Sequence, residues 1–197
     1  MLSQLIDIIN SSLKGYYKTG LFYSITELVP EVNDDTVSFY PAVIDEFGDA
    51  KIVSIDNLES AILYHRLTSK QTTLRDTQYG ASNKEVIDTY SLSLYVIGNR
   101  KKLKENAADT SLRVTSMIPD TFLQDGKQVA FTVMTNVDFN SSAIINAEFP
   151  NTEYSGILDV FMTRHDYNIR HTYRKKCTEC KTDCSKDRKS TRLNSSH

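Results

Sequence analysis

Apolar residues at the start of the chain recur every three or four positions, which is the spacing of one helix face. This stripe predicts a short amphipathic helix over residues 2–13, with Gly15 in a left-handed C-cap. Runs rich in β-branched and aromatic residues follow, and turn residues such as Gly48 separate them. They predict strands over residues 21–29 (ended by Pro30), 36–44, 51–55 and 62–65.

The strongest pattern covers residues 86–97, where apolar side chains alternate along a predicted strand. Alternation places Tyr90, Leu92, Leu94 and Val96 on one face of this strand, and Ser91, Ser93, Tyr95 and Ile97 on the other. We expect a core in which Leu92, Leu94, Phe131 and Val133 lie in central strands and Leu5, Ile9, Val114 and Ile118 pack over them.

In the second half of the chain, segments with the helical spacing of apolar residues alternate with segments that have the strand spacing. It predicts a helix over 103–118 stopped by Pro119, a strand over 128–137, a short helix capped by Asn140 or Ser141, and two last strands over 156–162 and 167–173. The order of elements predicts a single α+β domain over residues 1–175. Its sheet is mixed and mainly antiparallel, and two or three helices pack on it.

A polar stretch interrupts these patterns between Thr68 and Asn83. It shows neither the helical nor the strand period, and a long segment without structure inside a small domain is usually functional or disordered. We interpret residues 66–85 as an exposed arm.

Composition and motifs narrow the function by exclusion. The chain has 197 residues, of which 40% are hydrophobic and 24% charged, and only 7 are glycine. No GxGxxG, GxxxxGK[ST], GxSxG or HExxH occurs, which removes the anchors for dinucleotide, P-loop, hydrolase and zinc-protease chemistry. No apolar run is long enough for a transmembrane helix, the N-terminus lacks a signal peptide, and the formal net charge of -2 argues against a nucleic-acid binder.

Histidines are the remaining candidates for catalysis at neutral pH. His65 lies in a polar strand without an evident partner, and His165 and Asp166 lie near the predicted last turn. Adjacent strand residues face opposite ways, so we interpret these histidines as surface or turn residues. The alternative is a small enzyme with a nonstandard site formed by His165, Asp166 and Glu153.

Three cysteines cluster in a tail over residues 176–186. Their C-x2-C-x3-C spacing, with a histidine upstream, resembles half of a zinc site, although no second pair follows. A zinc-stabilised binding module therefore stays open as an alternative, beside a redox dithiol and free thiols in a reducing compartment. The zinc candidates are Cys177, Cys180, Cys184 and His171.

The layout of residues 1–175 resembles the tail terminator proteins of tailed bacteriophages, a group of small tail-assembly proteins. The similarity lies in a short N-terminal helix, a strand ending Phe39-Tyr40-Pro41-Ala42-Val43-Ile44, and the strand Tyr90-Ser91-Leu92-Ser93-Leu94-Tyr95-Val96, which leads through Asn99-Arg100-Lys101 into a helix. The arm and the cysteine-rich tail depart from that pattern.

This resemblance implies a mechanical role. Tail terminators form a ring, usually a hexamer, that caps the finished tail tube and presents a surface to the neck; they use no cofactor and catalyse no reaction. The expected partners are copies of the chain itself and the tail-tube and neck proteins, with no membrane and no sequence-specific nucleic acid. The expected location is the virion, assembled in the host cytoplasm. The arm would contact a neighbouring subunit through Thr68, Lys70, Arg75 and Tyr79.

The last eleven residues, DRKSTRLNSSH, read as one translated frame of a sequencing adapter. We expect residues 187–197 to be an artefact without an ordered structure; the alternative is a genuine polar tail. The string carries Arg188, Lys189 and Arg192 against Asp187, so the chain without it has a formal net charge of -4.

If the string is an artefact, no evolved contact depends on it, and deleting residues 187–197 leaves the melting temperature unchanged. Differential scanning calorimetry of the full and shortened chains checks this. A loss of several degrees, which corresponds to at least ~1 kcal/mol in a domain of this size, would instead identify a genuine segment.

Overall fold

The structure is a computed structural model that describes residues 1–33, 36–54, 60–76, 83–124, 126–149 and 159–176. The helices of this part are α1 (Leu2–Lys14), α2 (Arg100–Leu103), α3 (Ala107–Met117) and α4 (Ser141–Glu148). The strands are β1 (Leu21–Asn33), β2 (Thr36–Ile44), β3 (Ala50–Ile52), β4 (Ala61–Asp76), β5 (Asn83–Asn99), β6 (Thr121–Gln124), β7 (Lys127–Asp138) and β8 (Val160–Lys176).

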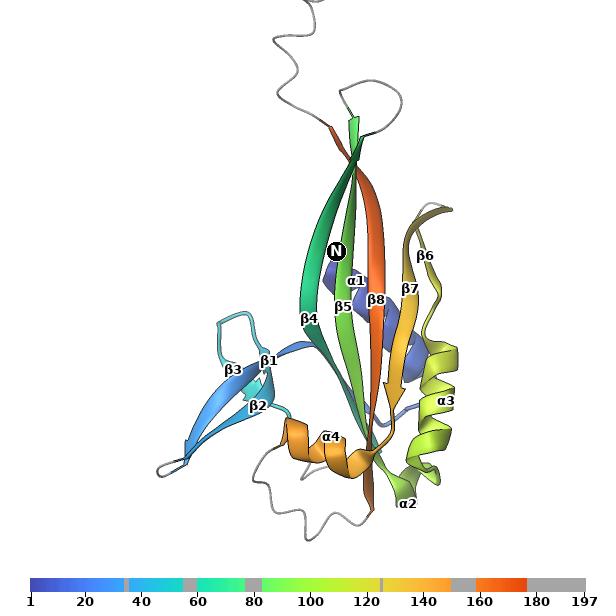
Figure 1. Cartoon of the computed structure of the whole chain (residues 1–197). Helices are drawn as coiled ribbons and strands as arrows, with labels where there is room; N and C mark the ends of the chain where they lie inside the picture. Colours follow the sequence, from blue (N-terminus) through green and yellow to red (C-terminus); the bar gives the residue numbers. More distant parts are fainter. Residues whose placement is uncertain (34–35, 55–59, 77–82, 125, 150–158, 177–197) are drawn as a thin grey trace, which may run out of the picture.

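All strands of the described residues belong to one eight-stranded sheet in the order β3-β2-β1-β4-β5-β8-β7-β6 (Figure 1). Neighbouring strands are antiparallel except β1 and β4, which run parallel. The helices lie on both faces, with α1 behind the sheet and α4 in front of it in this view. The prediction of an α+β fold with a mixed, mainly antiparallel sheet is confirmed.

The centre of the sheet is β5, whose 17 residues all pair with β8. On its other side β5 pairs with β4 along almost the same length. The predicted alternation is confirmed: Leu92 and Leu94 enter one hydrophobic core, and Tyr95 and Ile97 enter a second core on the opposite face. A strand with apolar side chains on both faces needs a cover on each.

The first core lies under α1 and α3. The apolar stripe predicted for the N-terminal helix faces the sheet, because Leu5, Ile6, Ile9 and Leu13 are all buried there. Asn106 caps α3 by accepting a hydrogen bond from the backbone N of Asp109 at 2.9 Å. The expected packing of Leu5, Ile9, Val114 and Ile118 over Leu92 and Leu94 is confirmed.

The second core lies between the sheet and α4. The rings of Tyr64 and Tyr95 stack with their centroids 4.9 Å apart, and Ile144 of α4 packs in the same cluster. Arg66 on β4 donates to Glu148 Oε1 at 2.7 Å, which ties the end of α4 to the sheet.

One glycine is required where β5 meets β8. A Cβ on Gly98 would lie 2.3 Å from Cζ of Phe161, which is fully buried and is paired with Gly98 in the register. The missing side chain therefore makes room for the phenylalanine ring.

Two predicted helix details are wrong. Gly15 has φ -58° and is right-handed, so α1 does not end in a left-handed cap. The helix predicted over 103–118 begins only at Ala107 as α3, and Leu103 instead ends the separate short helix α2, where Lys104 follows at φ 57°. The break occurs because Asn106 starts a new helix by capping it.

The predicted end of the first strand at Pro30 is also wrong, because β1 continues to Asn33. Beyond Thr26, β1 pairs with β2 alone. Proline lacks a backbone donor and is tolerated where one side of a strand is free.

The expectation that residues 68–83 lack regular structure is wrong for the described part. Residues 69–76 of β4 pair with residues 84–91 of β5, and the same stretch of β5 pairs with β8. These three strands extend beyond the rest of the sheet (Figure 1). Backbone pairing on both sides of β5 sustains the strands here without the apolar period that the prediction required.

The predicted last pair of strands is one strand, β8, from residue 160 onwards; residues 156–158 lie outside the described part. His165 and Asp166 therefore lie inside a strand and not beside a turn. A long β8 is favoured because β5 offers it a partner at every residue.

Phe131 and Val133 are not core residues as predicted. They lie on β7, which only the short β6 separates from the edge of the sheet, and the Val133 side chain is 43% exposed. Partial cover at the edge explains the difference from Leu94, which is fully buried on the central strand.

Replacing Leu94 with alanine should lower the free energy of unfolding by about 2–5 kcal/mol, because it opens a cavity in the first core. The matched change Val133→Ala should cost less than about 1 kcal/mol, because that side chain is already exposed. Urea unfolding followed by circular dichroism measures both. Equal costs would show that the first core is not organised around β5.

Candidate functional site

The interpretation of the histidines as surface or turn residues is wrong. His65 on β4 is fully buried under α1. Its Nε2 atom lies 2.9 Å from Asn10 Oδ1 on α1, and its Nδ1 atom lies 2.7 Å from the Tyr167 hydroxyl on β8. The Asn10 amide nitrogen donates to the carbonyl of Tyr23, which turns its oxygen toward His65. The Nε2 atom of His65 is therefore the donor and Nδ1 accepts from Tyr167.

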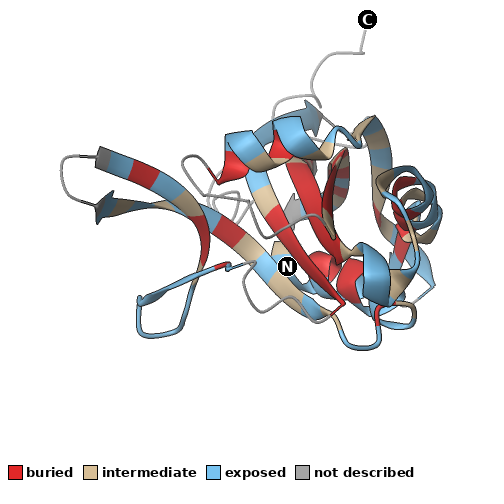
Figure 2. Cartoon of the chain, turned by 90° about the horizontal axis from the view of Figure 1, so that it is seen from below, coloured by how far each residue is buried: buried red, intermediate tan, exposed pale blue. Residues whose placement is uncertain are grey.

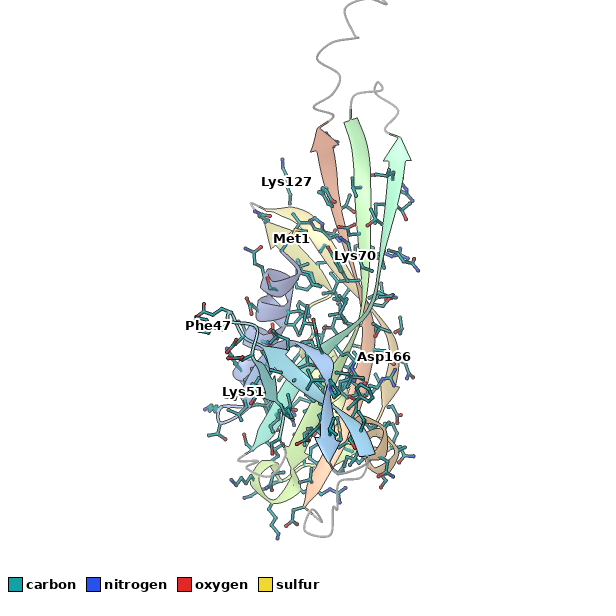
Figure 3. The ribbon with its side chains drawn as sticks, turned by 90° about the vertical axis from the view of Figure 1, so that its left-hand side faces the viewer. Met1, Phe47, Lys51, Lys70, Lys127 and Asp166 are labelled. Atoms are coloured by element: carbon teal, nitrogen blue, oxygen red, sulfur yellow. The ribbon has the colours of Figure 1, made fainter. Side chains whose placement is uncertain are left out.

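His165 and Asp166 are not brought together. His165 is fully buried, with Nδ1 3.4 Å from Thr115 Oγ1 on α3 and Nε2 3.1 Å from Thr163 Oγ1. Asp166 points to the other face, where it accepts from Ser93 at 2.6 Å and from Arg164 at 2.8 Å (Figure 3). Glu153, the third residue of the proposed enzyme site, lies outside the described residues.

Of the four residues proposed as zinc ligands, only His171 lies among the described residues. His171 is buried on β8, where its ring stacks on Tyr173 with centroids 5.1 Å apart. Cys177, Cys180 and Cys184 lie outside the described residues. Within the described ranges, no group of three histidine, cysteine or acidic side chains is arranged to hold a metal ion.

The residues predicted for the arm interface lie along β4, apart from Tyr79, which lies outside the described part. Thr68 is exposed at an irregularity in the pairing of β4 with β5. Arg75 lines a shallow groove of about 620 Å³ on one face of the extended strands. Lys70 points to the other face, toward Asp88.

Asp88 is a buried carboxylate held by three neighbours. It accepts hydrogen bonds from Thr72 at 2.6 Å and Tyr90 at 3.2 Å, and Lys70 Nζ lies 3.3 Å away. Burial alone would raise the pKa of Asp88, but the bonds from Thr72 and Lys70 hold the pKa below its usual value. The predicted contact residue Lys70 therefore has a role within the chain.

Exposed apolar side chains also gather on a projecting part of the sheet, for which the sequence predicts no functional residue. We call residues 27–52 the wing; they comprise the outer part of β1, together with β2 and β3. Figure 2 shows it extending from the left of the body. Its register puts Leu28, Val32, Val37 and Phe39 on one face, and these side chains are 47%, 68%, 56% and 50% exposed.

The apolar face of the wing is turned away from the body. Tyr40 lies on the opposite face of β2 and packs against the second core, and the Val53 backbone N binds the carbonyl of Pro41 at 2.8 Å. Strand alternation then directs Phe39 outward. The signal in the sequence was present, because the predicted strands over 21–29 and 36–44 have apolar residues on both faces.

The turn between β2 and β3 presents Phe47. Its side chain is 83% exposed and points away from the ribbon (Figure 3). Asp45 Oδ1 accepts from the backbone N of Phe47 and of Asp49, both at 2.9 Å, and Gly48 supplies the φ of +88°. These bonds fix the turn, so Phe47 is held outward.

The α2 helix carries a run of basic residues. Arg100, Lys101 and Lys102 are exposed, and so is Lys104 beyond the helix; Lys101 pairs with Asp159. Beside them, α2 and α3 border a groove of about 550 Å³, in which the side chain of Leu112 is 76% exposed. Arg113 on this groove pairs with Glu105 at 2.8 Å.

No protein-family model and no curated protein matches this sequence. Across the described ranges, none of the helices has the length and apolar character needed to cross a membrane.

The buried histidines predict loss of stability in mild acid. Burial lowers the pKa of His65 to about 3 and that of His165 to about 4, whereas an exposed histidine has a pKa of about 6.5. The unfolded chain therefore takes up protons below about pH 6.5 that the folded chain rejects. Stability is full above that pH and falls as the pH drops toward the folded values, by about 2 kcal/mol per histidine at pH 5.

Urea unfolding between pH 7.5 and pH 5 measures this dependence. His65→Gln should lower the free energy of unfolding at pH 7.5, because it disturbs the bonds to Asn10 and Tyr167. It should also make the pH dependence shallower by about one proton. A variant with the wild-type slope would show that His65 does not contribute to the pH dependence.

Proposed function

We propose that the chain is a structural subunit of a tailed-bacteriophage virion. It is a tail terminator-like protein that forms a ring, six copies in a hexamer, caps the tail tube and joins it to the neck. In this proposal it assembles in the host cytoplasm, and it needs neither a cofactor nor a catalytic residue.

The observation that carries the proposal is the apolar face of the wing. Four large apolar side chains on paired strands are about half exposed or more, although the rest of the sheet is covered on both faces at its centre. A contiguous exposed apolar surface on a projecting sheet is typical of an interface with another protein. A chain that acts by assembly needs such a surface.

The fold places two different candidate contact surfaces at opposite ends of the sheet. The wing is one end of the sheet, and β6 with the neighbouring α3 is the other (Figure 1). Two different surfaces at opposite ends of one subunit are what a head-to-tail ring requires. The extended ends of β4 and β5 supply a second proposed contact with the neighbouring subunit, through Thr68 and Arg75.

Light scattering of the full chain at high concentration, alone and with tail-tube protein, tests the proposal. We expect a closed oligomer, visible by electron microscopy as a ring on tube ends. Phe39→Ser should weaken association at least about tenfold, because it removes an apolar side chain from the centre of the wing face.

Phe139→Ser is the matched control, because this phenylalanine is 57% exposed and lies outside the wing. It should leave the oligomer unchanged. A wild-type chain that stays monomeric in the presence of tail tubes would contradict the proposed function. Equal effects of the two variants would remove the wing as its basis.

A further inference from the structure

We propose that the wing of one copy docks on the α2–α3 groove of the next copy, with Phe47 as the anchor. This inference rests on the proposed ring and names its two contact surfaces. The occupant of the groove is thus a second copy of this chain.

The β2–β3 turn of the wing is suited to insert a side chain into a groove. Phe47 is the most exposed large apolar side chain among the described residues, and its turn is held by two hydrogen bonds to Asp45 Oδ1. A fixed aromatic side chain loses little conformational freedom when it binds, which is the property of an interface anchor.

The α2–α3 groove offers apolar side chains that Phe47 can cover. The groove, of about 550 Å³, has two apolar lining residues, Leu103 and Leu112, and Leu112 is 76% exposed. The rest of the lining is polar or charged: Lys104, Glu105, Asp109, Arg113 and Ser116. An aromatic ring placed there would cover a leucine that the isolated chain leaves in water.

Charge favours this pair of surfaces over two wings in contact. The wing carries exposed carboxylates at Glu27, Asp45, Glu46 and Asp49, against Lys51. The acceptor end carries the basic residues at positions 100, 101, 102 and 104, and Arg113 on the groove. Its acidic residues are Asp109, Glu105, which pairs with Arg113, and Asp159, which pairs with Lys101, so basic residues remain in excess. Wing against wing would bring like charges together, whereas the acidic wing and the acceptor end carry opposite excess charge.

The positions of the two surfaces allow a ring. The wing lies on the left of the body and α2 and α3 on the right in Figure 1. A contact between different surfaces on opposite sides repeats from copy to copy and closes if the rotation permits. A contact of the wing with itself would stop at two copies.

Two variants with complementary defects test the inference. Phe47→Ser removes the anchor and keeps the groove, whereas Leu112→Glu keeps the anchor and places an acidic group in the groove. Both positions are strongly exposed, so we expect both full-length variants to fold, with melting curves as the check. Ile8→Glu, at a side chain 43% exposed on α1 and outside both surfaces, is the control for the added charge.

Native mass spectrometry of the full-length chains gives the readout. Each variant alone should be monomeric where the wild type and Ile8→Glu form the ring. An equimolar mixture of the two variants should form one-to-one dimers and nothing larger. In such a dimer, Phe47 of the Leu112→Glu chain docks in the intact groove of the Phe47→Ser chain, and no second intact pair of surfaces remains.

Two results would overturn the inference and leave the proposed function standing. In one, Leu112→Glu assembles like the wild type, which places the acceptor elsewhere. In the other, Phe47→Ser assembles normally, which removes the anchor. A wild-type chain that forms no oligomer, even on tail tubes, would contradict the proposed function itself.

Discussion

The fold depends on the pairing of β5 with a long strand on each side. β8 accompanies it over all 17 residues, and β4 over almost as many. Since β5 carries apolar side chains on both faces in its second half, the sheet has to be covered twice. The α1 and α3 helices cover one face and α4 covers the other.

Two of the polar side chains buried in this fold are bound by partners distant in sequence. His65 lies between Asn10 and Tyr167, and Glu148 at the end of α4 accepts from Arg66. These contacts tie α1, α4 and β8 to β4. These buried groups are thus bound within the chain, whereas the wing and the α2–α3 groove leave large apolar side chains exposed.

The sequence predicts those parts of the fold that depend on local pattern. The strand through Leu92 and Leu94 and the helix through Leu5 and Ile9 are visible because burial imposes their periods. The outer half of β4 is missed because its strand is maintained by backbone bonds to β5, which leave no pattern in side chains such as those of Thr72 and Thr73. The burial of His65 and the outward face at Phe39 depend on which strands become neighbours, and this is a property of the topology.

The separation of β5 and β8 in the chain has a consequence during synthesis. β8 is complete only 77 residues after β5, because β5 ends at Asn99 and β8 ends at Lys176 (176 − 99 = 77). At about 5–20 residues per second, a ribosome needs on the order of 4–15 s to produce the missing neighbour. Throughout that interval the whole length of β5 lacks its second neighbour, so its open edge is available for wrong pairing until β8 emerges.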